Sequence, residues 1–305
     1  MVVVDNGSGG PEIDAAVALG GVSVVTAPRN LGFGAGCNLG ASSTDGEVLV
    51  FLNPDTVVRP GGIAALVAAL EERSVGVAQA RLLLLDRPDV LNSGGNVLHL
   101  SGLAWPGGYG EPASGLTDVR EIAYASGAAL AMRSDVFREL GGFTEELFLY
   151  QEDLDLSWRA RLSGRSVVVV PSADVLHDYV FERPDRRKEY YLERNRLVFV
   201  LTSYSGRLLL LLAPVLLAVE VAIAFVAVRE GWLAEKVRGW RWLVGHRSWL
   251  RGHRRRVQAL RRVPDRELAH LLTPVVDPVM LTLPAGSSLV NGAFSLWWRA
   301  VRVFL

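Results

Sequence analysis

The sequence contains very little cysteine. Cys37 is the single cysteine among 305 residues, so no disulfide can form within the chain and a disulfide-stabilised secreted scaffold is excluded. Cys37 lies among glycines with no histidine near it in sequence. This pattern favours a small buried residue over a catalytic nucleophile, and the composition fits a reduced, cytosolic location.

Several other signatures are missing. The first residues have no charged n-region followed by a cleavage site, so we expect no secretory signal there. The glycine-rich stretch 30–40 is not followed by Gly-Lys-Ser/Thr, and its glycine spacing differs from the dinucleotide fingerprint. No internal repeat is visible. The lack of a basic, glycine-rich triphosphate loop also weighs against a nucleotidyltransferase.

The zero net charge hides a strong asymmetry. Residues 1–228 carry 18 Lys and Arg against 27 Asp and Glu, and residues 229–263 carry 11 against 2. Residues 264–305 are balanced, with 3 of each sign. The distribution predicts an acidic catalytic body and a basic attachment segment.

The first 85 residues alternate between apolar strand-like runs and helical or glycine-rich segments, which predicts an α/β fold with a doubly wound parallel sheet. The apolar run 48–52 is typical of a central, buried strand. Pro54 ends that strand and leaves Asn53 and Asp55 at the carboxyl edge of the sheet, where such sheets bind ligands. An acid there suits a divalent cation that carries substrate phosphates. The alternative is that Asn-Pro-Asp is simply a turn.

A second acidic cluster begins a predicted helix. Glu152 and Asp153 fall in its first turn, where the helix dipole favours acids; the functional alternative is a general base at the mouth of a pocket. His177 follows another apolar strand and is either structural or a further metal ligand. Arg194 and Arg196, beside two tyrosines, suit either phosphate recognition or a solvated helix face.

These segments belong to a series of short motifs that occur in a fixed order. They are Val4-Asp-Asn-Gly-Ser8, Asn30-Leu-Gly-Phe-Gly34, Asn38-Leu-Gly40, Leu52-Asn-Pro-Asp-Thr56, Ser126-Gly-Ala128, Gly141-Gly-Phe-Thr-Glu145, Tyr150-Gln-Glu-Asp-Leu-Asp155, His177 and Tyr191-Leu-Glu-Arg-Asn-Arg196. Each motif is weak alone. Their joint order makes roughly residues 1–200 resemble the inverting family 2 glycosyltransferases with a GT-A fold, most closely the rhamnosyltransferase-like branch.

The resemblance implies a role for each matching residue. The family's metal-binding element reads Asn53-Pro54-Asp55 here, so one negative charge is absent. The implied metal ligands for Mg²⁺ or Mn²⁺ are Asp55 and His177. Asp153, with Glu152 beside it, is implied as the catalytic base. The implied nucleotide-sugar contacts are Asp5, at the nucleobase, and Asn6, Asn30, Gly32, Asn38, Asn53, Asp55, Ser126, Gly127, Arg194 and Arg196.

The chemistry implied by the resemblance is inverting sugar transfer. The base takes a proton from an acceptor hydroxyl, and that oxygen attacks the anomeric carbon on the face opposite the nucleotide. One catalytic carboxylate suffices because the leaving diphosphate is already activated, whereas a hydrolase would need a second one as acid. The Leu-Asn-Pro-Asp-Thr variant leans toward a dTDP-rhamnose donor. The expected setting is cell-envelope polysaccharide synthesis.

The family normally begins with one more strand and helix before Val-Asp-Asn-Gly-Ser. This sequence starts at what should be the second strand, about thirty residues late on the scale of a βαβ unit. We interpret this as a misassigned start or a truncated copy. The alternative function is therefore an inactive remnant, or a nucleotide-sugar-binding protein without transferase activity.

The last hundred residues, 206–305, are predicted as a helical membrane-association region after a transferase domain at 1–205. Residues 208–228 carry one charge, Glu220, and are long enough to span a bilayer. Pro214 and Glu220 weigh against a span. An interfacial helix and a helix buried on the catalytic domain are the other two interpretations.

The segment Arg238–Arg256 mixes tryptophan with arginine, which suits a membrane interface with anionic lipid. Nucleic acid would attract the same charges, but nothing else in the sequence supports it, and we predict no nucleic-acid partner. Residues 289–305 add a further interfacial helix. We expect docking at the cytoplasmic face of the cell membrane, with a polyprenyl-linked glycan as acceptor; the oligomeric state is not indicated.

Overall fold

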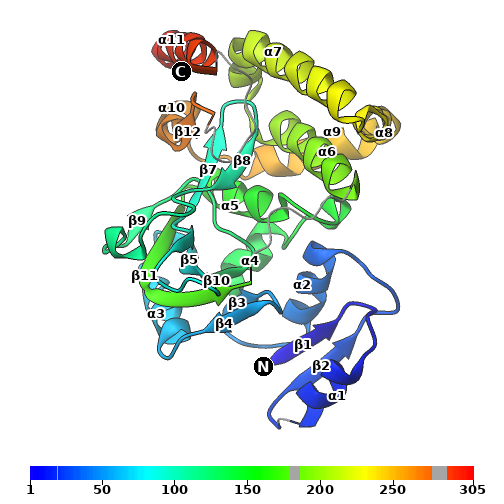
Figure 1. The fold of residues 1–305 in the computed structure, drawn as a ribbon, viewed down its shortest axis with the longest axis vertical. Helices are drawn as coiled ribbons and strands as arrows, with labels where there is room; N and C mark the ends of the chain where they lie inside the picture. The colour runs from blue at the N-terminus through cyan, green and yellow to red at the C-terminus, as the bar shows by residue number, and fades with distance from the viewer. Residues whose placement is uncertain (19, 179–185, 277–286) are drawn as a thin grey trace.

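The computed structural model describes residues 1–18, 20–178, 186–276 and 287–305. The chain opens with two parallel strands, β1 (Val2–Asp5) and β2 (Ser23–Thr26), which form a sheet of their own. Helix α1 (Pro11–Ala18) connects them, and α2 (Phe33–Ser42) follows. These elements agree with the predicted β–α alternation. Figure 1 shows them at one end of the long axis of the molecule.

The main sheet has seven strands in the order β3-β10-β5-β11-β4, with β6 paired to β5 and β9 to β11. The long strands β5 and β11 are parallel, whereas β10 runs antiparallel to both β3 and β5. The sheet is therefore mixed. Its strands are β3 (Val48–Leu52), β4 (Thr56–Val58), β5 (Val75–Leu84), β6 (Leu91–Ser93), β9 (Arg120–Glu121), β10 (Ala129–Arg133) and β11 (Ser166–His177).

The prediction that β3 is a central strand of a parallel sheet was wrong. β3 ends the strand order and pairs antiparallel to β10. Its continuous apolar sequence has another cause, because both of its faces are covered. Leu49 and Phe51 enter one core, while Val48 and Val50 pack against a second core on the opposite face.

The two cores lie on opposite faces of the main sheet. Helix α3 (Gly62–Ala69) supplies Leu66 to one. Helices α4 (Ser134–Leu140) and α5 (Glu152–Leu162) contribute Phe137 and Leu156 to the other. The helices thus hold the sheet from both sides and fix where the segment before α5 runs.

The segment 86–120 contains several short strands. β7 (Asn96–His99) and β8 (Ala104–Pro106) pair with each other, and β12 (Leu272–Thr273), near the end of the chain, joins β7. Three single turns of 3-10 helix are η1 (Ala113–Gly115), η2 (Glu145–Leu147) and η3 (Ala269–Leu271). A third core packs residues from Leu98 to Val301 together, so the last hundred residues share a core with the body.

Six helices gather at the end of the molecule opposite β1 and β2 (Figure 1). They are α6 (Arg186–Ser203), α7 (Gly206–Glu230), α8 (Leu233–Gly245), α9 (Arg247–Ala259), α10 (Asp265–Leu268) and α11 (Ser287–Val303). In the described part of the chain α7 alone is long and apolar enough to cross a bilayer.

Candidate active site

The segment before α5 has an unusual backbone. Phe148, Tyr150 and Gln151 have φ of 64°, 68° and 65°, in the left-handed region that costs energy for residues with a side chain. Asn195 of α6 holds this segment, because its Nδ2 donates to the carbonyls of Leu147, Leu149 and Tyr150 at 3.0, 2.9 and 2.7 Å. The strained loop is thereby fixed at the point where it delivers Glu152 and Asp153.

Asp153 lies against the small-residue segment 126–128. The backbone N–H of Gly127 donates to Oδ2 of Asp153 at 2.9 Å, and that of Leu154 donates to Oδ1 at 2.7 Å. A Cβ on Gly127 would lie 3.0 Å from the ring of Phe33. A side chain at this position would therefore crowd the aromatic ring and loosen the contact with the carboxylate.

Burial raises the pKa of Asp153 above its ordinary value, while the two N–H donors act in the opposite direction. Its neighbour Glu152 is 5 % exposed. Burial, and then the charge of Asp153, raise the pKa of Glu152 to about 8. Two adjacent carboxyl groups whose pKa values are both raised are typical of a functional site.

The small-residue segment 126–128 also contacts the Asn-Pro-Asp turn at residues 53–55. The N–H of Asn53 donates to the carbonyl of Ala128 at 3.0 Å, next to the Gly127 N–H that binds Asp153. The end of β3 and the start of α5 are thus joined through residues 126–128. Two motifs 100 residues apart in sequence meet at this point.

Asp55 and His177 also lie together. Nε2 of His177 is 3.5 Å from Oδ1 of Asp55, and Nδ1 of His177 is 2.9 Å from Oδ1 of Asn92. The contact with Asn92 orients the ring, and burial lowers the pKa of His177, which favours the neutral imidazole that a metal ion requires. Strands β4 and β11 pair in a register that puts His177 opposite Thr56. This register brings the side chain of His177 close to that of Asp55.

These residues fit a divalent cation that also binds substrate phosphate. Asp55 offers a half-exposed carboxylate, and Oδ1 of Asn53 is buried without a hydrogen-bond partner in the described chain. The described residues contain no group of three or more His, Cys, Asp or Glu side chains placed for a metal. A cation with one or two protein ligands that completes its shell with phosphate and water is typical of Mg²⁺.

The loop after β1 forms hydrogen bonds within itself and with the segment before α2. Oδ1 of Asp5 accepts from the N–H of Ser8 at 2.8 Å and from its hydroxyl at 2.7 Å, and these bonds lower the pKa of Asp5. Asn6 bonds to Leu31 and to the carbonyl of Gly32, each at 2.9 Å. The oxygen of Asn30 accepts from the N–H of Gly32 at 2.8 Å.

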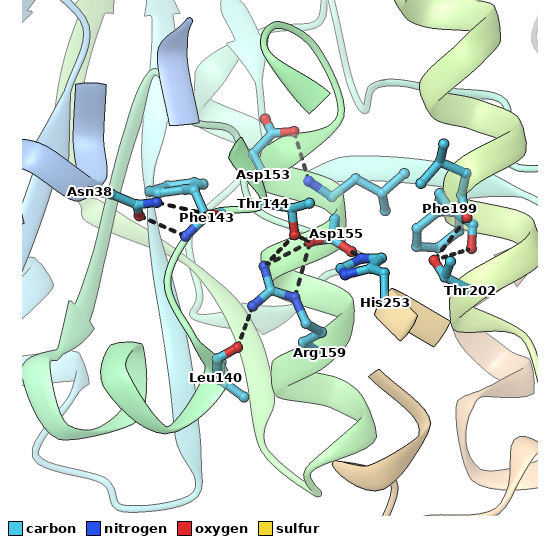
Figure 2. A network of polar contacts seen from close by, with 12 residues as sticks. Asn38, Leu140, Phe143, Thr144, Asp153, Asp155, Arg159, Phe199, Thr202 and His253 are labelled. Carbon is cyan, nitrogen blue, oxygen red and sulfur yellow. Dashed lines mark hydrogen bonds and ion pairs between the residues drawn. The ribbon is translucent and has the colours of Figure 1, made fainter. Parts of the chain in front are cut away.

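Gly32 brings α2 against the strained loop. The N–H of Phe33 donates to the carbonyl of Phe148 at 2.7 Å, and a Cβ on Gly32 would lie 2.3 Å from that carbonyl oxygen. Asn38 binds the backbone N–H and C=O of Phe143, both at 2.9 Å (Figure 2). In this structure the predicted donor contacts Asn6, Asn30, Gly32 and Asn38 link loops of the protein.

The prediction that Arg194 and Arg196 contact donor phosphates is corrected. Arg194 is 4 % exposed, and its Nη2 donates to the carbonyls of Glu146 and Leu147 at 2.8 and 2.6 Å. Arg196 is 1 % exposed and pairs with Glu193 at 2.9 Å and with Glu220. Both guanidinium groups are committed to protein partners, so they position the site.

A buried ion pair also supports α5 from within. Asp155 pairs with Arg159 at 2.7 Å and accepts from the hydroxyl of Thr144 at 2.7 Å (Figure 2). The guanidinium of Arg159 holds the pKa of Asp155 well below its usual range. Nε2 of His253, on α9, lies 3.5 Å from Asp155, so the last hundred residues reach the helix that carries Asp153.

Sequence reasoning missed several of these supports. Asn195 lies within a matching motif, but nothing in its local sequence indicates that its side chain binds the loop before α5. Two further supports are not indicated by any local sequence pattern. They are Gln79, whose Oε1 accepts from the N–H of Ser126 at 2.8 Å, and Asn92. A cavity of about 590 Å³ beside α2 is lined by residues that include Asn30, Asn38 and Phe148. Asp55 and Asp153 do not line it. The candidate active site is therefore defined by its hydrogen bonds and not by this cavity.

Comparison with known proteins gives a consistent picture. Residues 1–141 match the family described as glycosyl transferase family 2. The chain is 30 % identical over 201 residues to N-acetylglucosaminyl-diphospho-decaprenol L-rhamnosyltransferase of Mycobacterium tuberculosis, and the match covers 58 % of this chain and 66 % of that protein. It is 28 % identical over 195 residues to pre-mycofactocin glycosyltransferase of the same organism, with 63 % of this chain and 40 % of that protein covered.

Among solved structures, GalNAc-T7 with UDP, GalNAc and Mn²⁺ is similar with a TM-score of 0.55 and 20 % identity. That match covers 66 % of this chain and 41 % of the other. The chain therefore spans less than two thirds of the length of these relatives. The similarity shows the GT-A fold.

Proposed function

We propose that this chain, whose residues 1–141 match the model of glycosyl transferase family 2, is an inverting glycosyltransferase. It moves a sugar from a nucleotide-sugar donor to a hydroxyl of a glycan or lipid-linked glycan acceptor in cell-envelope polysaccharide synthesis. Rhamnose from dTDP-rhamnose is the donor sugar we favour, because one relative is named for L-rhamnosyl transfer.

The observation that carries this proposal is the link through residues 126–128. It joins the N–H of Asn53 to Ala128 and the N–H of Gly127 to Asp153. The turn that carries Asp55 and the half-buried carboxylate of Asp153 are thereby connected through one segment. Transfer needs these two groups on either side of the reacting carbon.

Asp153 acts as the general base in this proposal. Its raised pKa makes the carboxylate a stronger acceptor for the proton of an acceptor hydroxyl. The N–H groups of Gly127 and Leu154 hold the carboxylate in position. The deprotonating hydroxyl oxygen attacks the anomeric carbon opposite the leaving diphosphate, which inverts the configuration.

Asp55 and His177 would hold the divalent cation, Mg²⁺ or Mn²⁺, with the amide of Asn53 beside it. When bound there, such a cation would supply positive charge to offset the charge that develops on the leaving diphosphate. Asn92 keeps the ring of His177 turned toward Asp55. The role of this chain's residues is to present two ligands at the end of β3 and β11 and to leave the other positions to substrate and water.

Substitution Asp153→Asn tests the base. It keeps the shape of the side chain but removes the proton acceptor, so transfer falls at least about 10²-fold while binding of the nucleotide sugar is retained. Transfer is read by nucleotide release and binding by calorimetry with dTDP-rhamnose and Mn²⁺. Asp86→Asn, at a carboxylate whose side chain is 78 % exposed, is the matched control. Near-normal turnover of the Asp153 variant would remove this residue from the mechanism.

A second candidate function is binding of nucleotide sugars without transfer. The observation that favours it is the separation of β1 and β2, which carry Asp5, from the sheet that carries Asp55. Donor binding by the native chain with no nucleotide release, in the presence of a range of acceptors, would establish it.

We also propose that the chain works at the cytoplasmic face of the cell membrane. The relative named above acts, by its name, on a diphospho-decaprenol-linked sugar, and α7 is long and apolar. Sedimentation with anionic vesicles tests this location, and recovery of all protein in the soluble fraction would contradict it.

A further inference from the structure

Helix α7 shows two very different apolar faces. One is buried against the protein and carries Leu208, Leu212, Val215, Val219 and Ala227. The other faces solvent with large apolar side chains that are 61–76 % exposed: Leu210, Leu217, Val221, Phe225 and Val228. Pro214 and three alanines lie on the same exposed face. Surface helices of soluble proteins carry polar residues on this side, so the stripe needs an apolar partner.

Helix α11 carries a second exposed stripe beside the first. Leu289, Leu296 and Val303 are 79, 70 and 80 % exposed, whereas Trp298 and Val301 are buried. Nε1 of Trp297 donates to the carbonyl of Leu211 on α7 at 3.0 Å. The two helices therefore pack together, and Figure 1 shows them at the same end of the molecule.

The single charge within the apolar part of α7 is fixed to the catalytic body. Glu220 pairs with Arg196 of α6, with Lys236 of α8 at 2.9 Å and with Nε1 of Trp240 at 2.6 Å. Glu193 completes the cluster, 2.7 Å from Lys236. Arg196 and Lys236 are each 1 % exposed. We call these five residues the α7 anchor.

The α7 anchor decides how the helix meets a membrane. Glu220 lies near the middle of the 25-residue helix, so a spanning α7 would carry the anchor into the hydrocarbon core. Four ionised groups at that depth are very costly. The same α6 also binds the loop before Asp153 through Asn195, so it cannot leave the body without disrupting the site.

The charges around the stripes match an anionic surface. Exposed Arg207 and Arg229 flank the stripe of α7, with exposed Glu230 next to Arg229, and exposed Arg299 and Arg302 lie on α11, which contains no acidic residue. Helices of this kind lie in the plane of the interface with the apolar face toward the acyl chains and arginines at the headgroups.

We propose that α7 lies flat in the interface of an anionic phospholipid bilayer, with α11 beside it, and that it does not cross the bilayer. This deepens the membrane location given under the proposed function and rests on it. The inner face of α7, held by the α7 anchor, then fixes the distance between the membrane surface and the helix that supports the candidate active site.

Single-cysteine labelling tests the orientation, because Cys37 is the only native cysteine. In a Cys37→Ala background, Arg207→Cys and Arg229→Cys place thiols at the two ends of α7, and Leu217→Cys places one in the stripe. The protein is added to sealed phosphatidylglycerol-containing vesicles and treated with a membrane-impermeant maleimide. Both end positions are labelled from outside, and position 217 is labelled in solution but protected on vesicles. Protection of one end alone, or labelling of position 217 on vesicles, overturns the proposal.

A paired variant tests the stripe itself. Leu217→Ser with Phe225→Ser lowers partitioning into these vesicles at least about tenfold. Val17→Ser with Val119→Ser, at two exposed valines outside the C-terminal helices, leaves it unchanged. Equal partitioning of both variants overturns the proposal, as does a stripe variant that changes only self-association, which would make a second copy the occupant. Neither readout requires a donor sugar, so a chain without transferase activity still gives a decision on α7.

Discussion

Substitution of Asn195 isolates the clamp that holds the loop before Asp153. The amide nitrogen has two hydrogens for three carbonyls at 2.7–3.0 Å, so it makes two full hydrogen bonds and shares a third. At about 1 kcal/mol net for each bond, Asn195→Ala costs about 2 kcal/mol of unfolding free energy. Once the clamp is removed, the residues with left-handed backbone can relax, and the strain energy released offsets part of the loss of unfolding free energy.

The effect on transfer is larger than the effect on stability. A released loop moves Asp153 away from the N–H of Gly127, and a displacement of about 1 Å from the reactive geometry costs about 10²-fold in rate. The rate constant of transfer at saturating donor should fall by this factor. The free energy of unfolding is measured by urea titration on the same preparations.

Asn195→Asp separates the two ends of the side chain. It keeps an oxygen for the Nε of Arg194, which is 2.8 Å from Oδ1, but it turns an oxygen toward the three carbonyls. If the donor end matters, the Asp variant loses at least as much stability and rate as the Ala variant. An Asp variant within about 0.5 kcal/mol of the native chain with normal turnover would refute the clamp.

Three further substitutions test other parts of the site. Gly32→Ala drives a Cβ to 2.3 Å from the carbonyl oxygen of Phe148, whereas Gly61→Ala meets no atom within 4 Å at a similar φ; the first should lose at least about 2 kcal/mol more unfolding free energy than the second, and equal losses would show that the contact relaxes freely. The folded state keeps a proton on Glu152 up to a pKa of about 8 and the unfolded state releases it near 4.5, so stability should fall between pH 5 and pH 8 in urea titrations. That slope should be reduced in Glu152→Gln, and an unchanged slope would assign it to other groups. Asp55→Ala should weaken nucleotide binding in the presence of Mn²⁺ about tenfold or more while leaving metal-free binding intact, and identical calorimetric titrations would count against Asp55 as a ligand.

The sequence indicates where the candidate catalytic groups lie more clearly than it indicates the residues that position them. Asp55 follows the end of a predicted strand, and Asp153 lies at the start of a predicted helix. The structure places Asp153 against segment 126–128 and Asp55 beside His177. The burial of Arg194 and Arg196 could not be predicted, because two of their partners, the carbonyl of Glu146 and the carboxylate of Glu220, are 48 and 24 residues away. The sequence of a polar helix does not show whether its charged side chains are exposed to solvent or paired with one another.

The position of β3 was not readable from its sequence for a related reason. Apolar residues at every position predict cover on both faces, which the structure confirms, but they carry no information on how many edges are paired. The antiparallel direction of β10 depends on the path of residues 86–128. No local pattern fixes that path.

The end position of β3 has a practical consequence. The strand Val48–Leu52 is uncharged, β-branched and aromatic in composition, and one of its edges carries backbone N–H and C=O groups that pair with no strand in the described chain. Such an edge is a template for strands from other molecules. Purified protein should therefore self-associate through β3 as its concentration rises, and a lysine at the exposed Leu52 would be the first change to make when preparing soluble material.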